Sequence, residues 1–484
     1  MGPTTTASIS STNPALGRAG HRTANSQRPR TIIRPHSFAW LDFLIAMCAA
    51  GGLTASTLYG VQIRTSTFAA SDFKTLYASV WCFAHHVDAY NIANLQSVFV
   101  ANNVVQPEKW FGHAPVYPPT TLALLSPIAA MGMVTAAYVL MILSGVLLAV
   151  AVAALMRYAA VNFNMGPVWR MAIAGLCVGG PLLSFGLAMG NVSLAVAALC
   201  FLAFVWRKSG PPWSRSGSPW ISSVALALAL LLKPHLGLWT GLGMFLLPER
   251  AARAVVVRAI ALAAGFATAS MAAMAAMGTL GLEIHSYLGI LSAETSAGAS
   301  MSVASHEVLP IVAQITSLES IVGFWIASPM IRVALTGLLL LGLGFLLLRQ
   351  TKLVDTERGA LLAIGAWCTL GMIATYHRAH DAALVVVLVP WVVDRVRRTP
   401  FAWHAWVATM LYCAMSASAD FEVVKRWVSN ASEHSLTAFI LLRQAGLADL
   451  LLLCVLLLAM GRERTRVWAH GTASAEADDL AIAA

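Results

Sequence analysis

Long apolar runs separated by short polar segments limit most strongly what this chain can fold into. Of its 484 residues, 58% are hydrophobic and 11% are charged, about half the charged fraction of a typical soluble domain. Many runs approach the roughly 20 residues with which a helix crosses a bilayer. The sequence therefore predicts an all-α polytopic membrane protein with about twelve transmembrane helices. The predicted spans are 39–60, 134–156, 169–188, 191–206, 219–232, 235–248, 257–277, 322–348, 359–375, 382–395, 401–418 and 437–460.

The two ends of the chain differ from this apolar pattern. Residues 1–36 carry five arginines and no acidic residue, among many Ser, Thr and Pro residues. Such a composition cannot build a core. We therefore expect a disordered basic cytoplasmic tail over 1–36, a membrane domain over 37–466 and a second disordered tail over 467–484.

The segment 117–131 decides the orientation, because it is apolar but short and contains three prolines. If it lies along the outer surface as a helix, 22 of the 31 Lys and Arg fall in inner segments and seven in outer ones. If it spans, every later loop changes sides. The first arrangement follows the positive-inside rule. It places both termini in the cytoplasm and puts outer loops at about 61–133 and 278–321.

The same distribution explains the formal net charge of +10. Basic residues gather in the inner segments, so the charge is an orientation signal and no nucleic-acid partner is expected. Membrane lipids are the expected surroundings in a cell membrane.

The first outer loop holds the first candidate site residues. Asp72 follows the first apolar run closely, and Asp88, Tyr90 and Tyr117 follow in the same polar, aromatic stretch. Ionisable groups close to the bilayer surface suit the chemistry of a membrane enzyme. An ordinary connecting loop is an equally good interpretation of this segment alone.

A second group of candidates lies where apolar runs meet. Pro234 breaks any helix between two short runs, which places Lys233 and His235 at a turn near the surface. The functional interpretation is an ammonium offered to a lipid phosphate, and the alternative is a lysine that reaches the interface along its own stem. Asn191 lies in a further turn between two spans.

The run from Tyr376 to Asp381 places polar groups densely between two apolar spans. Arg378 is a natural bidentate phosphate donor, and His377 and His380 can donate or carry protons near neutral pH. A charged interfacial loop is the alternative. No histidine pair has metal-ligand spacing, so we expect no metal and no cofactor.

Together these features resemble glycosyltransferase family 87, membrane enzymes of the GT-C fold that include polyprenol-phosphate-mannose-dependent mannosyltransferases. The resemblance covers about 39–400. One position departs from the family, which commonly has Gly-Gln-x-Asn where this chain has no Gln before Asn191; that puts the role of Asn191 in question. The motifs that carry the resemblance are the Asp after the first span, Asp-Ala-Tyr-Asn (88–91), Tyr117-Pro118-Pro119 with Pro127, Gly190-Asn191, Leu232-Lys233-Pro234 and the late His-Arg-x-x-Asp.

The resemblance implies transfer of a sugar, a mannose-type hexose by family analogy, from a polyprenyl-phosphate donor to a lipid or glycan acceptor hydroxyl on the outer face. Inversion at the sugar carbon requires a general base, which by position is Asp72. The donor phosphate is expected to lie among Lys233, His235, His377 and Arg378. The residues expected to bind substrate or support the site are Asp88, Tyr90, Tyr117, Asn191, His380 and Asp381.

A transporter or flippase for a lipid-linked sugar or polyprenyl phosphate is the rival function. It would use similar cations but needs polar groups at mid-membrane. The predicted spans contain Arg332, Arg443 and Asp449, with no evident inverted repeat. A non-catalytic assembly protein is the third possibility.

The orientation is testable with cysteines introduced near Ser216 and Ser300. Because the charge distribution puts the first position inside and the second outside, an impermeant thiol reagent applied to cells should label only the second. The reverse pattern would contradict the topology.

Overall fold

The computed structural model is helical in every regular element that it describes. The bundle combines long membrane-type helices with short ones that end at prolines and glycines. The described residues are 37–63, 71–104, 116–179, 181–208, 219–295, 317–326, 328–375, 379–399, 402–417, 436, 439–440 and 443–483.

Four helices of the described chain are long and apolar enough to cross a membrane. They are α6 (Met133–Phe163), α12 (Arg250–Ala276), α15 (Pro329–Thr351) and the first part of α21 (Gln444–Ala483), over Gln444–Glu463. The all-helical membrane class is confirmed. The number of twelve spans stays a prediction, because most of the other helices are shorter.

Several predicted spans correspond to one helix each. These helices are α1 (Ser37–Ile63), α9 (Ser193–Val205), α10 (Trp220–Leu232), α11 (Pro234–Leu246), α16 (Glu357–Ala374) and α18 (Trp403–Ala417).

Three predicted spans are instead broken. Span 169–188 divides into α7 (Pro167–Val178) and α8 (Pro181–Ala188). Span 322–348 begins within α14 (Leu318–Trp325) and continues, after a break, as α15. Span 382–395 begins inside the 3₁₀ helix η3 (Ala379–Leu388) and continues as α17 (Val389–Arg398). Each helix after a break has proline at its first or second position, where the missing N–H costs nothing.

The last helix extends further than the sequence analysis expected. α21 continues to Ala483, through the segment assigned to a disordered tail. Its last residues are rich in alanine, which has the highest helix propensity. Residues 1–36 lie outside the described part of the chain.

Helix α6 defines two ends of the molecule. Its 31 residues make a rod about 46 Å long at 1.5 Å per residue. The 3₁₀ helix η1 (Ser126–Ala130) precedes its first residue, and the Arg397 guanidinium of α17 donates to Phe163 O at 2.8 Å at its other end. We name the end of the molecule near η1 the α2 end, and the end near Arg397 the basic end.

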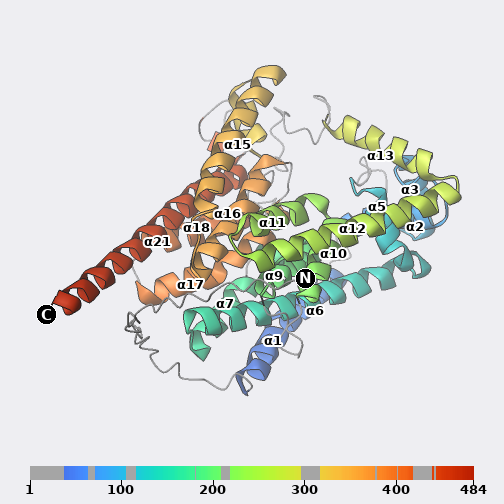
Figure 1. The fold of residues 1–484 in the computed structure, drawn as a ribbon. Helices are drawn as coiled ribbons and strands as arrows, with labels where there is room; N and C mark the ends of the chain where they lie inside the picture. Colours follow the sequence, from blue (N-terminus) through green and yellow to red (C-terminus); the bar gives the residue numbers. More distant parts are fainter. Residues whose placement is uncertain are drawn as a thin grey trace, which may run out of the picture.

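The α2 end is a small helical layer with its own core. It contains α2 (Ser71–Ala84), α3 (Ile92–Ala101), α5 (Pro119–Leu125), η1 and α13 (Leu280–Thr295), which gather on the right of Figure 1. Phe73, Leu76, Phe99 and Leu122 pack together in its interior. In its described parts, the predicted first outer loop is thus helical, and 117–131 contains the short helices α5 and η1.

At the basic end, opposite charges offset the arginines. Arg207 pairs with Glu249 at 2.8 Å and Glu357 at 2.7 Å, and Arg358 pairs with Asp394 at 2.7 Å. This network joins α9, α12, α16 and α17. It lies at the end that the charge distribution assigns to the cytoplasm.

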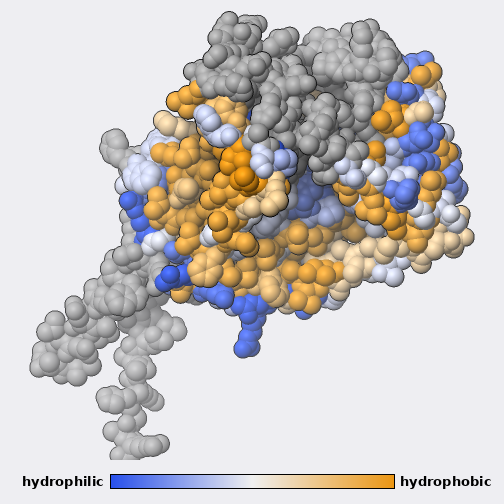
Figure 2. All heavy atoms as spheres, turned by 90° about the horizontal axis from the view of Figure 1, so that it is seen from above, coloured by the Kyte–Doolittle hydropathy of each residue, from blue (hydrophilic) through white to orange (hydrophobic). Residues whose placement is uncertain are grey.

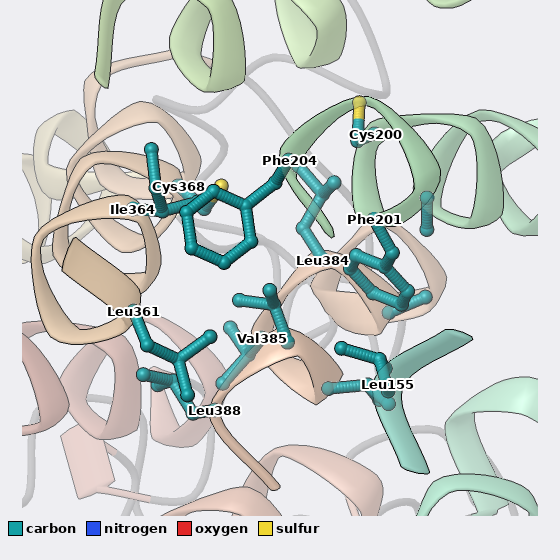
Figure 3. Close-up of a cluster of buried hydrophobic side chains, with 14 of the residues drawn as sticks. Leu155, Cys200, Phe201, Phe204, Leu361, Ile364, Cys368, Leu384, Val385 and Leu388 are labelled. Atoms are coloured by element: carbon teal, nitrogen blue, oxygen red, sulfur yellow. The ribbon is translucent and has the colours of Figure 1, made fainter. Parts of the chain in front are cut away.

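The main core lies between the two ends. Side chains of α9 (Phe201, Phe204) and α16 (Leu361, Ile364) meet those of η3 in its centre (Figure 3). Apolar residues also cover the middle of the surface, and hydrophilic ones gather toward the sides (Figure 2). Helix α15 shows this most clearly, since only 17% of its most apolar stretch is buried inside the protein. Such a band suits contact with lipid.

The hairpin of α10 and α11 allows a direct test. A Cβ at Gly237 would lie 2.7 Å from the backbone nitrogen of Leu230, whereas one at Gly241 would meet only the flexible Leu226 side chain at 3.7 Å. We expect Gly237→Ala to cost about 1–3 kcal/mol of stability and Gly241→Ala to be neutral or stabilising. Thermal unfolding in detergent measures both, and equal midpoints would contradict the packing of this hairpin.

Candidate active site

A hydrogen-bonded chain of side chains starts at Asp72, in the first turn of α2 at the α2 end. The side-chain amide of Asn191 donates to Asp72 Oδ2 over 2.7 Å. Asp72 is half-buried and Asn191 is buried. The carboxylate thus has a fixed orientation, and its position at a helix N-terminus favours negative charge.

The turn between α8 and α9 positions this pair. Gly190 has a φ of 65°, which glycine adopts without strain. Asn191 N–H donates to Gly186 O at 3.0 Å, and Phe73 N–H donates to Met189 O at 3.2 Å. One turn therefore holds both Asn191 and the start of α2. Asn191, whose role the missing Gln put in question, contacts the predicted base directly.

The chain continues through Ser193 to a buried ion pair. Ser193 N–H donates to Asn191 Oδ1 at 2.9 Å, and Ser193 Oγ lies 2.5 Å from the same oxygen. The Lys233 ammonium donates to Ser193 Oγ at 2.6 Å and to Asp381 Oδ1 at 2.8 Å. Ser193 Oγ also contacts Asp381 Oδ1. Four segments far apart in sequence meet here: the start of α2, the α8–α9 turn, the α10–α11 junction and η3.

Pro234 explains the position of Lys233. Lys233 ends α10 and precedes α11, with φ −144° and ψ 89°, because the residue before proline is disfavoured in the helical region. Its side chain is only 9% exposed, so it does not extend into solvent as the alternative interpretation held. A buried ammonium is tolerable when it is paired, and Asp381 supplies the opposite charge.

The other predicted phosphate ligands are described less fully. His235 is half-buried in the first turn of α11. His377 and Arg378 lie outside the described residues, as does the side chain of His380. Across the described chain, no three His, Cys, Asp or Glu side chains are grouped to hold a metal ion.

Asp88, Tyr90 and Tyr117 form a separate structural cluster. Asp88 Oδ1 accepts from Tyr90 N–H at 2.9 Å, the turn role that Asp-x-x-Asn suggests, and the Tyr90 hydroxyl donates to Tyr117 O at 2.6 Å. Asp72 lies in the first turn of α2 and Asp88 follows its last residue, Ala84, so the helix separates them by about 18 Å along its axis. Through these contacts the three residues stabilise the predicted first outer loop.

Helix α13 packs against this cluster through Glu283, a residue that the sequence analysis did not select. The Ser286 hydroxyl donates to Asp88 Oδ2 at 2.8 Å, and the rings of Tyr90 and Tyr287 lie 5.6 Å apart. Glu283 is only 1% exposed. Burial and then the charge of Asp88 raise the pKa of the Glu283 carboxyl from 4.5 to about 7.

Ser193 is the other important residue that the sequence analysis missed. It lies in an apolar run, where one serine carries no motif. Its only sequence signal is its position two residues after Asn191. In the turn at Gly190, this spacing lets Ser193 contact Asn191 Oδ1.

A family model for glycosyltransferase family 87 matches residues 116–375 of this chain. The matched region contains Asn191, Ser193 and Lys233, whereas Asp72 and Asp381 lie outside it. No curated protein and no solved structure gives a match.

Glu283 makes the packing of α13 depend on pH. Its pKa is about 7 in the packed state, so packing retains a proton that an exposed Glu releases near its ordinary pKa of about 4.3. Packing should therefore be tightest at low pH, weaken as the pH rises through about 4.3 to 7, and stay constant above.

Amide hydrogen exchange of 280–291, corrected for intrinsic pH effects, measures this. Protection should fall between about pH 4.3 and 7 in the wild type and stay level in Glu283→Gln, which mimics the protonated acid. The same pH dependence in both proteins would refute the assignment.

Proposed function

The chain belongs to glycosyltransferase family 87, and we propose that it moves a mannose-type hexose from a polyprenyl-phosphate donor to a lipid or glycan hydroxyl. Transfer takes place at the α2 end, on the outer face of the cell membrane, with both termini in the cytoplasm. The observation that carries this proposal is the side-chain network that joins Asp72 to Lys233. It brings a candidate base and a candidate phosphate cation into one site.

Asp72 is the proposed general base. A carboxylate can remove the acceptor proton as the new sugar–oxygen bond forms, since the proton moves while charge develops on the acceptor. The amide of Asn191 holds one carboxylate oxygen at 2.7 Å. This contact supports the proposal because a base contributes only when its orientation toward the reacting hydroxyl is fixed.

Lys233 is the proposed centre of the phosphate site. An ammonium has three donor protons, and the contacts with Ser193 and Asp381 use two of them. One donor is thus available to a ligand oxygen. His235 stands in the first turn of α11, where the helix dipole favours an anion. Fixed positive groups here stabilise the phosphate as it takes up charge on leaving.

Arg378 and His377 are proposed to belong to this site because they are close in sequence to Asp381. Arg378 precedes Asp381 by three residues, and three residues reach at most about 11 Å. Because Asp381 contacts Lys233 directly, this reach allows Arg378 to contribute to the same site. We propose that Arg378 binds it with its planar fork and that His377 donates a further hydrogen bond.

The separation of the two groups suits inversion. Asp72 and Lys233 do not touch each other; Asn191 and Ser193 lie between them. The acceptor hydroxyl attacks the sugar carbon on the face opposite the departing phosphate. A base and a phosphate cation therefore need to be separated by about the width of a sugar ring. In inverting glycosidases, likewise, the two carboxyl groups are separated to leave room for the attacking water.

Two of the three charged residues noted within the predicted spans, Arg332 and Arg443, favour the enzyme over a transporter; the third, Asp449, is buried and its carboxylate has no hydrogen-bond partner among the described residues. Arg332 pairs with Glu319 at 3.0 Å, and Arg443 donates to Ser320 O at 2.8 Å. Both contacts anchor α14 to its neighbours. A transport pathway needs polar groups that face the substrate, and these two arginines instead serve the packing of the bundle.

Labelled donors test the function directly. Purified protein with cell lipid extract and a panel of radiolabelled polyprenyl-phosphate sugars should yield a labelled product that the donor alone does not. Asp72→Asn keeps the shape of the side chain but cannot accept a proton, so turnover should fall by about 10²–10⁴.

Asp355→Asn is the matched control, because Asp355 is exposed and lies two residues before Glu357 of the charged network at the basic end; this variant should transfer normally. A mutant of Asp72 that retains more than about a tenth of wild-type turnover would contradict the assigned base.

A further inference from the structure

We propose that Ser193 is a positioning residue that couples Lys233 to Asp72, so that occupation of the phosphate site affects the base. This inference rests on the proposed function. Its basis is that the Ser193 hydroxyl contacts Lys233, Asp381 and Asn191 together, with Lys233 Nζ at 2.6 Å and Asn191 Oδ1 at 2.5 Å.

The number of hydroxyl protons limits how these contacts are made. Ser193 has one proton and two acceptor oxygens beside it, Asn191 Oδ1 and Asp381 Oδ1. A serine hydroxyl donates one bond at a time, so the proton has two alternative partners. Lys233 donates to the Ser193 oxygen in either arrangement.

The charge on Asp381 selects between the two partners. When Lys233 donates fully to Asp381, at 2.8 Å, the ammonium offsets the carboxylate charge and the serine proton can turn to Asn191. When a donor phosphate draws Lys233 toward itself, Asp381 loses part of this compensation and attracts the proton more strongly. Asn191 Oδ1 then keeps only the Ser193 N–H bond, at 2.9 Å.

The change at Asn191 reaches Asp72 because the two ends of one amide are linked. Asn191 binds Ser193 through Oδ1 and Asp72 through Nδ2. The bonds to Oδ1 set the direction of the amide plane and thus of the N–H group that holds the base. A shift of the Ser193 proton therefore alters how firmly Asp72 is oriented when the donor is bound.

The position of Ser193 in its helix argues against a capping role. Serine at the start of a helix commonly satisfies a free backbone N–H with its hydroxyl. Here Val192 occupies the N-cap position without a side-chain cap, and Ser193 is the first residue of α9. Its buried hydroxyl instead contacts Lys233 and Asp381.

Steady-state kinetics of Ser193→Ala test the proposal. We expect kcat to fall about tenfold or more through misorientation, with the donor KM within about twofold of wild type and little change in the unfolding midpoint. Ser193→Thr keeps the hydroxyl and should retain more turnover than Ser193→Ala. Ser222→Ala is the matched control, because Ser222 is a buried serine of α10 whose hydroxyl has no partner among the described residues; it should not alter turnover.

A double mutant shows whether Ser193 acts through Asn191. In the Asn191→Ala background, Ser193→Ala should cost much less than it does in the wild type, since the link to Asp72 is already lost. Full turnover in Ser193→Ala, equal losses in the Thr and Ala variants, or strictly additive losses would each overturn the proposal. A wild-type protein that transfers no sugar would instead overturn the proposed function, and this inference with it.

Discussion

The buried pair of Lys233 and Asp381 is the interaction on which the arrangement of the candidate site depends. Removing one partner of such a pair leaves an uncompensated charge in a poorly solvated place, at a cost of about 3–5 kcal/mol. The pair joins the α10–α11 junction to η3, and Ser193 adds the start of α9. Asn191 then connects this group to α2 through Asp72. These contacts are hydrogen bonds and an ion pair, so directional polar contacts, and not apolar burial alone, fix the positions of the site residues.

The two ends of the bundle use charge differently. At the basic end, Arg207 and Arg358 pair with Glu249, Glu357 and Asp394. The charges of this network are used in contacts within the protein. At the α2 end, Lys233 keeps donor capacity for a ligand. This contrast fits the proposed function, in which a lipid-linked donor binds at one end of the bundle.

The sequence predicted the class of the fold and the regions of the site better than their details. Apolar length predicted a helical membrane protein, and Pro234 predicted the turn at Lys233. The orientation drawn from the basic asymmetry stays a prediction. The chain cannot show from spacing alone that Lys233 meets Asp381, 148 residues away, or that Ser193 lies between them. The break in 169–188 was missed although Gly179-Gly180-Pro181 is a helix-breaking signal, and the segment divides there into α7 and α8. Asp88 was close to Asp72 in sequence, yet the length of α2 separates them.

The central claim is that the donor phosphate lies at Lys233, with the reacting sugar between it and Asp72. An experimental structure with a bound polyprenyl phosphate tests this claim most directly. The account predicts a phosphate oxygen within hydrogen-bonding distance of Lys233 Nζ and the guanidinium of Arg378 on the same phosphate. A phosphate more than about 6 Å from both cations would lack direct charge partners and would contradict the account.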